Sequence, residues 1–416
     1  MVSKAQFNRA LCARFLGLLL LPFAATAQAP APAPAPTLLA SGVEYRHLQT
    51  RSPAGEPWSI HILEISRQEK SIELRAVAGR GEDGSMQREL PTAMANRLAA
   101  SGENVLAVVN GDFDLPAPYL GVPDGLSMTS GRVWTTGKPG WPNFALLQNR
   151  EPVFAVPDVA IELTAGKRRI PVAALNKPFG TAWGEGPRAY TREFRPAIRS
   201  QVPLDAAVIR KPSSPQPLRV DVTIRGVVRE VHRGIRELSL LDDAVVIACR
   251  SAGPSAEADS FCGLRPGERV KLRIRVRMVE KKGIQHAIGG FPTLVENGRR
   301  SIVGTPGENL KLRHQRTAIC TNESKIIFVV VDGRQPQLSV GMTLEELADL
   351  MVSLGCTTAM NTDGGGSSVM AVAVGATLRR PGPHAGGVNP PLRIVNSPSD
   401  GQERGRGNAW VILKPR

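Results

Sequence analysis

The chain has 416 residues, of which 42% are hydrophobic and 21% are charged, and its formal net charge is +15. This is ordinary globular composition, and the length is sufficient for one large or two modest cores. Aromatic residues make up only 5% of the chain, which argues against recognition dominated by aromatic stacking, whereas 41 glycines and 34 prolines favour a β-rich body with many turns.

The first 27 residues have the features of a secretory signal peptide. Three basic residues precede the apolar stretch Phe15–Ala25, which is too short to span a bilayer, and Ala25-Thr26-Ala27 fits a signal-peptidase site. A buried core helix is the alternative interpretation. Residues 28–37 are an Ala/Pro linker, and no later stretch is apolar enough for a membrane span. We therefore expect a periplasmic or secreted protein without a transmembrane span.

The excess of basic residues favours acidic partners, such as a phosphorylated glycan, an anionic envelope surface or nucleic acid. A solvated basic face is the alternative, because the arginines are scattered. No nucleic-acid recognition module is visible, so we expect no specific nucleic-acid binding.

Four cysteines remain after removal of the signal peptide, and none has the CxxC spacing of a metal site. Cys249 and Cys262 bracket a polar loop, whereas Cys320 and Cys356 lie in apolar segments. An oxidising compartment would allow one or two disulfides. Buried free thiols at Cys320 and Cys356 are the alternative.

The predicted elements begin with a β-rich N-terminal region over residues 38–103. Apolar residues alternate over residues 72–78, and a helix is predicted over residues 92–100, ended by Gly102. The predicted catalytic domain covers residues 104–416. It starts with a buried strand at residues 105–109 and contains a β-insertion at about 205–285, where apolar and polar residues alternate.

The segment from Arg316 to Met370 carries the clearest pattern. A tight turn joins predicted strands at 317–320 and 326–331 into a hairpin. A helix follows, with Thr343 as its N-cap, Glu346 as the capping-box partner and Gly355 at its end. A further strand at residues 357–362 completes a predicted βαβ unit with parallel strands. The expected fold is therefore α+β, with mixed β-sheets and a βαβ unit that carries the site.

This topology would bring three charged residues to one sheet edge, where ligands bind in open sheets. Asp332 and Asp363 follow the two parallel strands, and the hairpin returns Arg316 to the same end. Arg316 could hold a phosphate with its planar fork, and the two aspartates could act as acid, base or nucleophile. Turn-forming aspartates and a surface arginine are the alternative interpretation.

A glycine-rich loop directly follows Asp363. Consecutive glycines allow main-chain N–H groups to approach an anion closely, and hydroxyls add donors. The candidate substrate-binding residues are Arg316, Gly364, Gly365, Gly366, Ser367, Ser368, Asn110, Asp112, Arg334 and Asn361.

The candidate catalytic residues are Asp363, Asp332 and His286, although a lone histidine is more often structural. No cofactor is expected. An all-oxygen site for a divalent cation such as calcium, built from Asp112, Asp332 and Asp363, is left open.

Several segments together resemble the phosphodiester glycosidase family, in the family's order and over roughly residues 100–413. They are Val109-Asn110-Gly111-Asp112-Phe113, His286-Ala287-Ile288-Gly289-Gly290-Phe291-Pro292, Arg316-Thr317-Ala318-Ile319-Cys320, Val331-Asp332-Gly333-Arg334, Gly341-Met342-Thr343-Leu344-Glu345-Glu346-Leu347-Ala348, Asn361-Thr362-Asp363-Gly364-Gly365-Gly366-Ser367-Ser368, and Asn396-Ser397-Pro398-Ser399-Asp400-Gly401 before Glu403-Arg404. Asp112 and Cys320 stand where the family usually has glycine.

The resemblance implies an exported hydrolase that cleaves the glycosidic bond of a sugar-1-phosphodiester in an envelope or extracellular glycan. The leaving phosphate would rest on the glycine loop and Arg316. Two other functions remain open: a cation-dependent phosphodiesterase that cuts the P–O bond, and a non-catalytic protein that binds or assembles an envelope polysaccharide.

Overall fold

A computed structural model describes residues 35–415, apart from 185, 196, 211–217, 252–262, 280–282, 304–310 and 374–390. The predicted signal peptide, most of the Ala/Pro linker and Cys262 lie outside the described residues. No helix in the described part of the chain is both long and apolar enough to cross a membrane.

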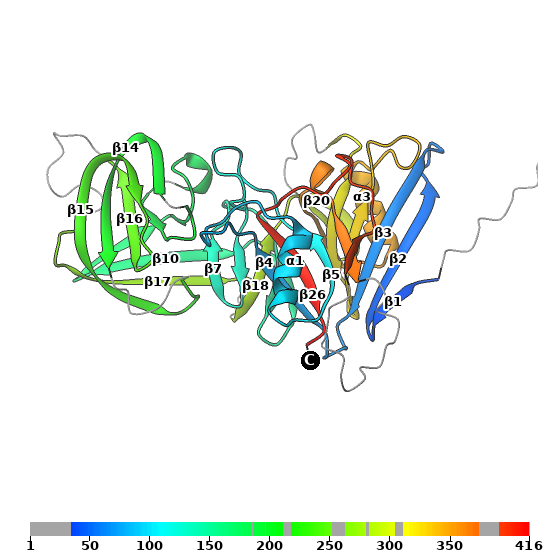
Figure 1. Ribbon diagram of the computed structural model, residues 1–416, viewed down its shortest axis with the longest axis horizontal. Coiled ribbons are helices and arrows are strands. Elements are labelled where there is room, and N and C mark those ends of the chain that lie inside the picture. The colour runs from blue at the N-terminus through cyan, green and yellow to red at the C-terminus, as the bar shows by residue number, and fades with distance from the viewer. Residues whose placement is uncertain are drawn as a thin grey trace, which may run out of the picture. The chain divides into compact units, whose positions relative to one another are not determined.

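The described strands form four sheets (Figure 1). The first sheet has the order β1 (Thr37–Ala40), β2 (Val43–Arg51), β3 (Pro57–Ser66), β22 (Lys325–Val331), β21 (Arg316–Thr321), β23 (Thr358–Asn361), β19 (Thr293–Glu296) and β20 (Arg299–Val303). The second has the order β11 (Arg168–Val172), β10 (Asp158–Ala165), β17 (Arg269–Arg277), β15 (Thr223–Ser239), β14 (Ala197–Arg210), β16 (Ala244–Arg250), β13 (Arg188–Tyr190) and β12 (Ala174–Leu175).

The two smaller sheets have five strands each. The third has the order β7 (Arg132–Thr135), β6 (Ser127–Thr129), β18 (Ile284–Gly289), β8 (Asn143–Leu147) and β9 (Pro152–Ala155). The fourth has the order β25 (Leu392–Ile394), β24 (Met370–Ala373), β5 (Val105–Asn110), β26 (Asn408–Leu413) and β4 (Glu73–Ala78). Helices α1 (Pro91–Ala100) and α3 (Leu344–Ser353) and the 3₁₀ turns η1 (Thr181–Trp183) and η2 (Gly365–Ser367) accompany them.

The α+β prediction is correct only in part, because strands dominate the described residues and α1 and α3 have ten residues each. The predicted βαβ unit is not shown as a pair of neighbouring parallel strands. Strands β22 and β23 do run in the same direction, but both pair with β21, which lies antiparallel between them. The strand order is therefore β22, β21, β23, so β23 forms its hydrogen bonds with β21 and not with β22. The sequence pattern of strand, helix and strand did not reveal this inserted neighbour.

The helix α3 forms for the reasons predicted. Thr343 accepts a hydrogen bond from the main chain of Glu346, and the Glu346 side chain accepts one from the main chain of Thr343. This capping box satisfies main-chain donors that the first turn leaves open. Gly355 has φ +77°, which is the left-handed conformation that ends many helices.

Strand β22 of the first sheet is buried on both faces, because successive apolar residues point to opposite sides of the sheet. In β22, Ile327, Val329 and Val331 pack with α3, whereas Ile326, Phe328 and Val330 pack into a core shared with the third and fourth sheets. A strand buried on both faces reads as a continuous apolar run, as residues 326–331 do. The shared core fixes the ends of β5, β21 and β23, from which the candidate site is built.

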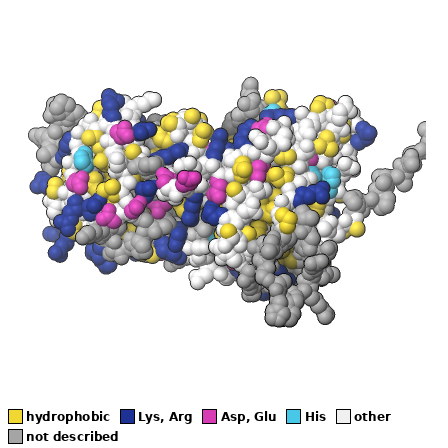
Figure 2. All heavy atoms as spheres, viewed as in Figure 1, with side chains coloured by type: hydrophobic (Ala, Val, Ile, Leu, Met, Phe, Trp, Pro, Cys, Tyr) yellow, Lys and Arg dark blue, Asp and Glu magenta, His cyan; other side chains and the backbone are white. Residues whose placement is uncertain are grey.

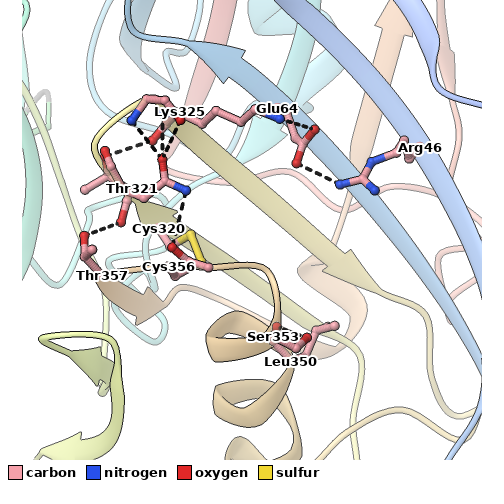
Figure 3. Close-up of a disulfide and its surroundings, with 12 residues drawn as sticks. Arg46, Glu64, Cys320, Thr321, Lys325, Leu350, Ser353, Cys356 and Thr357 are labelled. Carbon is pink, nitrogen blue, oxygen red and sulfur yellow. Dashed lines mark hydrogen bonds and ion pairs between the residues drawn. A yellow bond between two sulfur atoms is a disulfide. The ribbon is translucent and has the colours of Figure 1, made fainter.

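A disulfide joins Cys320, in β21, to Cys356, which follows α3 (Figure 3). Cys320 pairs with Ile327 at one end of the hairpin, and Arg316 pairs with Val331 at the other. The disulfide therefore lies at the sheet edge opposite to Arg316. Cys249 is also disulfide-bonded. Disulfides of this kind are typical of proteins outside the cytoplasm.

Candidate functional site

The glycine loop directly follows β23 and is fixed by two neighbouring segments. Asn110, at the end of β5, donates from Nδ2 to the main-chain oxygen of Asp363 at 2.8 Å. The main-chain N–H of Gly365 donates to the oxygen of Gln315, just before β21, at 2.9 Å. Gly365 has φ +61°, a conformation that glycine adopts without strain. The side chain of Asn110 thus fixes the main chain at the start of the glycine loop.

Two guanidinium groups lie close against this loop. A Cβ added to Gly365 would lie 3.3 Å from Nη2 of Arg334, and one added to Gly366 would lie 2.5 Å from Nη2 of Arg404. Arg334 is exposed, and Arg404 pairs with Asp400. We call Gly364–Gly366 together with Arg334 and Arg404 the anion cradle. Glycines allow this close approach, and the carboxylate of Asp400 also lies 2.5 Å from the Cβ position of Gly366. Two guanidinium groups beside main-chain amides suit a phosphate group.

Asp363 is the carboxyl group that lies at the anion cradle. Its Oδ2 accepts a hydrogen bond from Nη1 of Arg406, which also contacts Oγ of Ser367, while Nη2 of Arg406 binds Oδ1 of Asp114. The Asp363 side chain is 13% exposed. Burial raises the pKa of Asp363, and the charge of Arg406 opposes this shift. A mostly buried carboxyl with a raised pKa is suited to proton transfer.

Asp332 is directed into the protein, where its oxygens accept hydrogen bonds. Oδ2 accepts from Oγ of Ser59 at 2.8 Å and lies 2.9 Å from Nε2 of His61, and Oδ1 accepts from the main chain of Ser397 at 2.8 Å. Burial alone would raise the pKa of Asp332, but these hydrogen bonds and the neighbouring His61 lower it. Asp332 therefore joins β3, β22 and the segment that begins at Asn396.

Arg316 lies where the topology predicted, at the sheet edge near Asp332 and the glycine loop. Its guanidinium points inward, however: Nε donates to the oxygen of Met342 at 2.8 Å and Nη2 donates to that of Leu312 at 2.5 Å. Burial lowers the pKa of Arg316 to about 10. The guanidinium groups that lie against the glycine loop are therefore those of Arg334 and Arg404, and not that of Arg316.

His286 lies apart from the anion cradle. It lines a cavity of about 370 Å³ together with Ile65, Leu146 and other residues. Its Nδ1 accepts long hydrogen bonds from the main chain of Ala76 and Ser130, at 3.3 and 3.4 Å. Burial lowers the pKa of His286 to about 4. The residues that line this cavity do not include Asp363 or the glycine loop.

The remaining predicted residues support the main chain around the loop. Asn361 donates from Nδ2 to the oxygens of Phe291 and Thr362, at 2.7 and 2.8 Å. Ser368 accepts a hydrogen bond from Thr317 at 3.1 Å. These are positioning contacts, and a substrate contact by either residue stays a prediction.

Asp112 is buried next to the loop and is only 1% exposed. Its Oδ2 accepts from the main chain of Gly125 at 2.6 Å, and its Oδ1 has no hydrogen-bond partner among the described residues. Burial, followed by the charge of Asp124, raises the pKa of Asp112 to about 8. The neighbouring Lys177 is fully buried, and burial lowers its pKa to about 7.

The three aspartates proposed for a cation site lie in separate hydrogen-bond networks. Asp112 binds Gly125, Asp332 binds His61 and Asp363 binds Arg406. Within the described residues, no group of three or more His, Cys, Asp or Glu is placed to hold a metal ion.

Sequence reasoning assigned no role to His61, Asp114, Arg404 or Arg406. Arg404 lies in one of the segments that resemble the phosphodiester glycosidase family, so the sequence could have indicated it as a site residue. His61 carries no such signal, because a histidine within a strand of alternating residues looks like any other half-buried position. Asp114 and Arg406 are 292 residues apart and meet only through the pairing of β5 with β26.

The family model described as phosphodiester glycosidase matches residues 219–413. No curated protein matches the chain.

Three solved structures are similar to the chain. A hypothetical protein from Synechocystis has a TM-score of 0.70 and 16% identity, over 94% of this chain and 65% of that one, so this chain spans just under two thirds of its length. A protein of Burkholderia pseudomallei K96243, provisionally described as exported, has a TM-score of 0.63 and 24% identity, over 87% and 75% of the two chains. The zebrafish N-acetylglucosamine-1-phosphodiester alpha-N-acetylglucosaminidase catalytic domain, auto-inhibited by its pro-peptide, has a TM-score of 0.42 and 14% identity, over 92% and 87%.

The first two structures share the fold of this chain. The residues matched by the family model include Asp332, Arg334, the whole glycine loop and Arg404. Over residues 219–413, which include these site residues, the chain is similar to the phosphodiester glycosidase family.

Proposed function

We propose that this protein is an exported enzyme that hydrolyses the glycosidic C–O bond of a sugar-1-phosphodiester in an envelope or extracellular glycan. The observation that carries the proposal is the anion cradle next to Asp363. The guanidinium groups of Arg334 and Arg404 lie close against Gly365 and Gly366, with the carboxylate of Asp400 beside Arg404. Such a cradle is suited to the phosphate of a leaving group.

The chemistry follows from the leaving group. As the bond between the anomeric carbon and the phosphate oxygen breaks, negative charge develops on the phosphate, and fixed cations and main-chain donors stabilise it. Water then adds its hydroxyl to the anomeric carbon, and its proton leaves to solvent or to the phosphate. The products are a free sugar and a phosphomonoester.

We assign Asp363 as the carboxyl group that activates this water or attacks the anomeric carbon. It borders the anion cradle, and its partner Arg406 holds it in place through contacts with Ser367 and Asp114. Asp332 is assigned a positioning role, because its oxygens are already bound by Ser59, His61 and Ser397. Hydrolysis at an acetal carbon commonly uses carboxylates in such roles.

Export is supported by three observations. The first 27 residues fit a signal peptide. Cys320 and Cys356 form a disulfide, which persists in oxidising compartments. A protein with the same fold is provisionally described as exported.

The test is hydrolysis of a panel of sugar-1-phosphodiesters by the purified chain in ¹⁸O-labelled water, with and without a chelator. Release of free sugar that carries the label, unaffected by the chelator, is the expected result. Label in the phosphate, with activity lost on chelation, would instead identify a cation-dependent phosphodiesterase. Binding without turnover of any member would point to a non-catalytic polysaccharide-binding protein.

A further inference from the structure

The outer side of the second sheet carries a continuous row of basic side chains along β17. The residues that alternate with them pack into the core, and the outward ones are Arg269, Lys271, Arg273, Arg275 and Arg277. Because every second residue of a strand points to the same side, at a spacing of about 7 Å, these cations form one line. Figure 2 shows Lys and Arg side chains gathered at the left end of the view, over this sheet.

The neighbouring strand β15 adds a further cation to the row. Arg225 of β15 lies directly opposite Lys271 of β17, and both side chains are exposed. Like charges that lie directly opposite each other destabilise an antiparallel pair of strands. A bound anion would offset this repulsion, which the fold itself does not require. We call Arg225 together with the outward basic residues of β17 the basic face.

A hollow of about 590 Å³ lies at one end of the basic face. Arg225, Arg269 and Lys271 line it, together with neutral residues such as Thr164 and Gly166. No carboxylate is among the described residues that line the hollow. The three basic side chains are exposed, so a ligand in solvent can reach them directly.

The nearby acidic residues compensate the other half of the basic face. The acidic side chains of β10 lie opposite that half of β17, whereas the neutral Thr164 lies opposite Lys271. Asp221 is 3.6 Å from Arg273, also in that half. Glu268 is paired with an arginine of β11. The positive charge is therefore least compensated around the hollow.

We propose that the basic face binds a polyanionic glycan that carries a phosphate in each repeat, with Arg225, Arg269 and Lys271 as its main contacts. The class of partner rests on the proposed function, because a glycan of sugar-1-phosphodiesters has a negative charge in every repeat. A line of cations along one strand suits such a chain better than a single small anion, since successive phosphates meet successive side chains. The basic face thus holds the polymer, and small diesters do not need it.

The test measures binding of a polymer of N-acetylglucosamine 1-phosphate repeats joined by phosphodiesters. The full chain carries Asp363→Asn, so that the polymer is not consumed, and fluorescence anisotropy of the labelled polymer gives the affinity. The triple variant Arg225→Gln, Arg269→Gln and Lys271→Gln should bind the polymer about tenfold more weakly or worse, because three charge-assisted contacts with phosphate are lost.

A second triple variant is the matched control. Arg51→Gln, Arg299→Gln and Arg300→Gln remove the same number of positive charges from exposed positions of the first sheet. This variant should keep the affinity for the polymer. Thermal unfolding checks that both triple variants are folded. Without Asp363→Asn, the basic-face variant should hydrolyse a small sugar-1-phosphodiester with the kcat/KM of the wild type.

The outcomes separate this inference from the proposed function. Equal weakening in both triple variants, or no binding of the polymer, overturns the basic face, and hydrolysis of small diesters would still support the proposed function. Polymer binding lost only in the basic-face variant supports the basic face, even if no diester is hydrolysed and the proposed function alone fails. Equal or tighter binding of single-stranded DNA or of phosphatidylglycerol vesicles, lost in the same variant, would overturn the glycan as the partner.

Discussion

The guanidinium of Arg406 bridges the carboxyl groups of Asp363 and Asp114. Nη1 binds Asp363 and Nη2 binds Asp114, whose other oxygen accepts from Nε of Arg88 at 2.6 Å. Arg406 is 3% exposed and Asp114 is 1% exposed, so water weakens these pairs little. The bridge joins the glycine loop to the segments after β5 and before β26, and it holds Asp363 against the anion cradle.

Asp363→Asn should lower turnover of a sugar-1-phosphodiester about a hundredfold or more, because an amide can neither accept the proton of water nor attack carbon. The variant also removes one carboxylate partner of the buried Arg406, so the thermal unfolding midpoint should fall, and turnover is compared at a temperature at which both proteins are folded. Steady-state kinetics and thermal unfolding of the same preparation check this. Asp349→Asn, at an exposed residue paired with Arg300, is the control. Full activity in Asp363→Asn would remove Asp363 from the mechanism.

Arg334→Gln and Arg404→Gln should each weaken binding of inorganic phosphate about tenfold, because each removes a charge-assisted donor beside the glycines. Calorimetric titration at fixed ionic strength measures the change. Arg299→Gln, which removes an exposed charge from β20, should leave the affinity unchanged. Equal weakening in all three variants would show a general effect of net charge and contradict the anion cradle.

Asp332→Asn should destabilise the protein by about 3 kcal/mol at pH 7, since it breaks a buried, hydrogen-bonded pair with His61. The pKa of Asp332 is lowered in the folded protein. Its contribution is therefore present above the ordinary carboxyl pKa of about 4 and is lost as pH falls below it. Urea unfolding at pH 7 and pH 3 measures this, and the two proteins should become more alike at pH 3. An unchanged difference at pH 3 would contradict the assignment.

Asp112→Asn should gain stability relative to the wild type as pH rises from about 4 to about 8. The pKa of Asp112 is raised to about 8, so the folded protein binds this proton more tightly than the unfolded chain, and the wild type loses stability over that range. Lys177 and Asp124 face the group and are present in both proteins, so the comparison cancels most of their own titration. Urea unfolding at pH 5 and pH 8.5 measures the shift. A pH-independent difference would contradict it.

Removal of the Cys320–Cys356 disulfide by replacement of both residues with alanine should destabilise the protein by about 4 kcal/mol, because the bond closes a loop between residues 36 positions apart. Catalytic turnover at a temperature well below unfolding should be unchanged, because the disulfide lies at the sheet edge opposite to Arg316 and the glycine loop. Chemical unfolding and kinetics measure the two effects. A large loss of turnover in a folded variant would contradict this separation.

The local signals in the sequence determined much of the site's scaffold. The hairpin of β21 and β22, the capping box of Thr343 and Glu346 and the glycine loop after β23 are all present in the structure. Each depends on residues close together in the chain. Main-chain conformation, capping and the alternation of buried residues are set by such neighbours, so one sequence is sufficient to read them.

Only the tertiary structure decided which charged groups meet. Sequence placed Arg316 at the phosphate, but its guanidinium is bound to main-chain oxygens, and Arg334 and Arg404 approach the glycines instead. His61 reaches Asp332 across 271 residues, and Arg406 reaches Asp114 across 292. Side-chain direction and long-range partners depend on sheet order, and β21 between β22 and β23 has no local signature. The order of strands and turns in the sequence thus determined the sheet edge at which the site forms. The tertiary packing of the sheets determined which side chains lie at that edge.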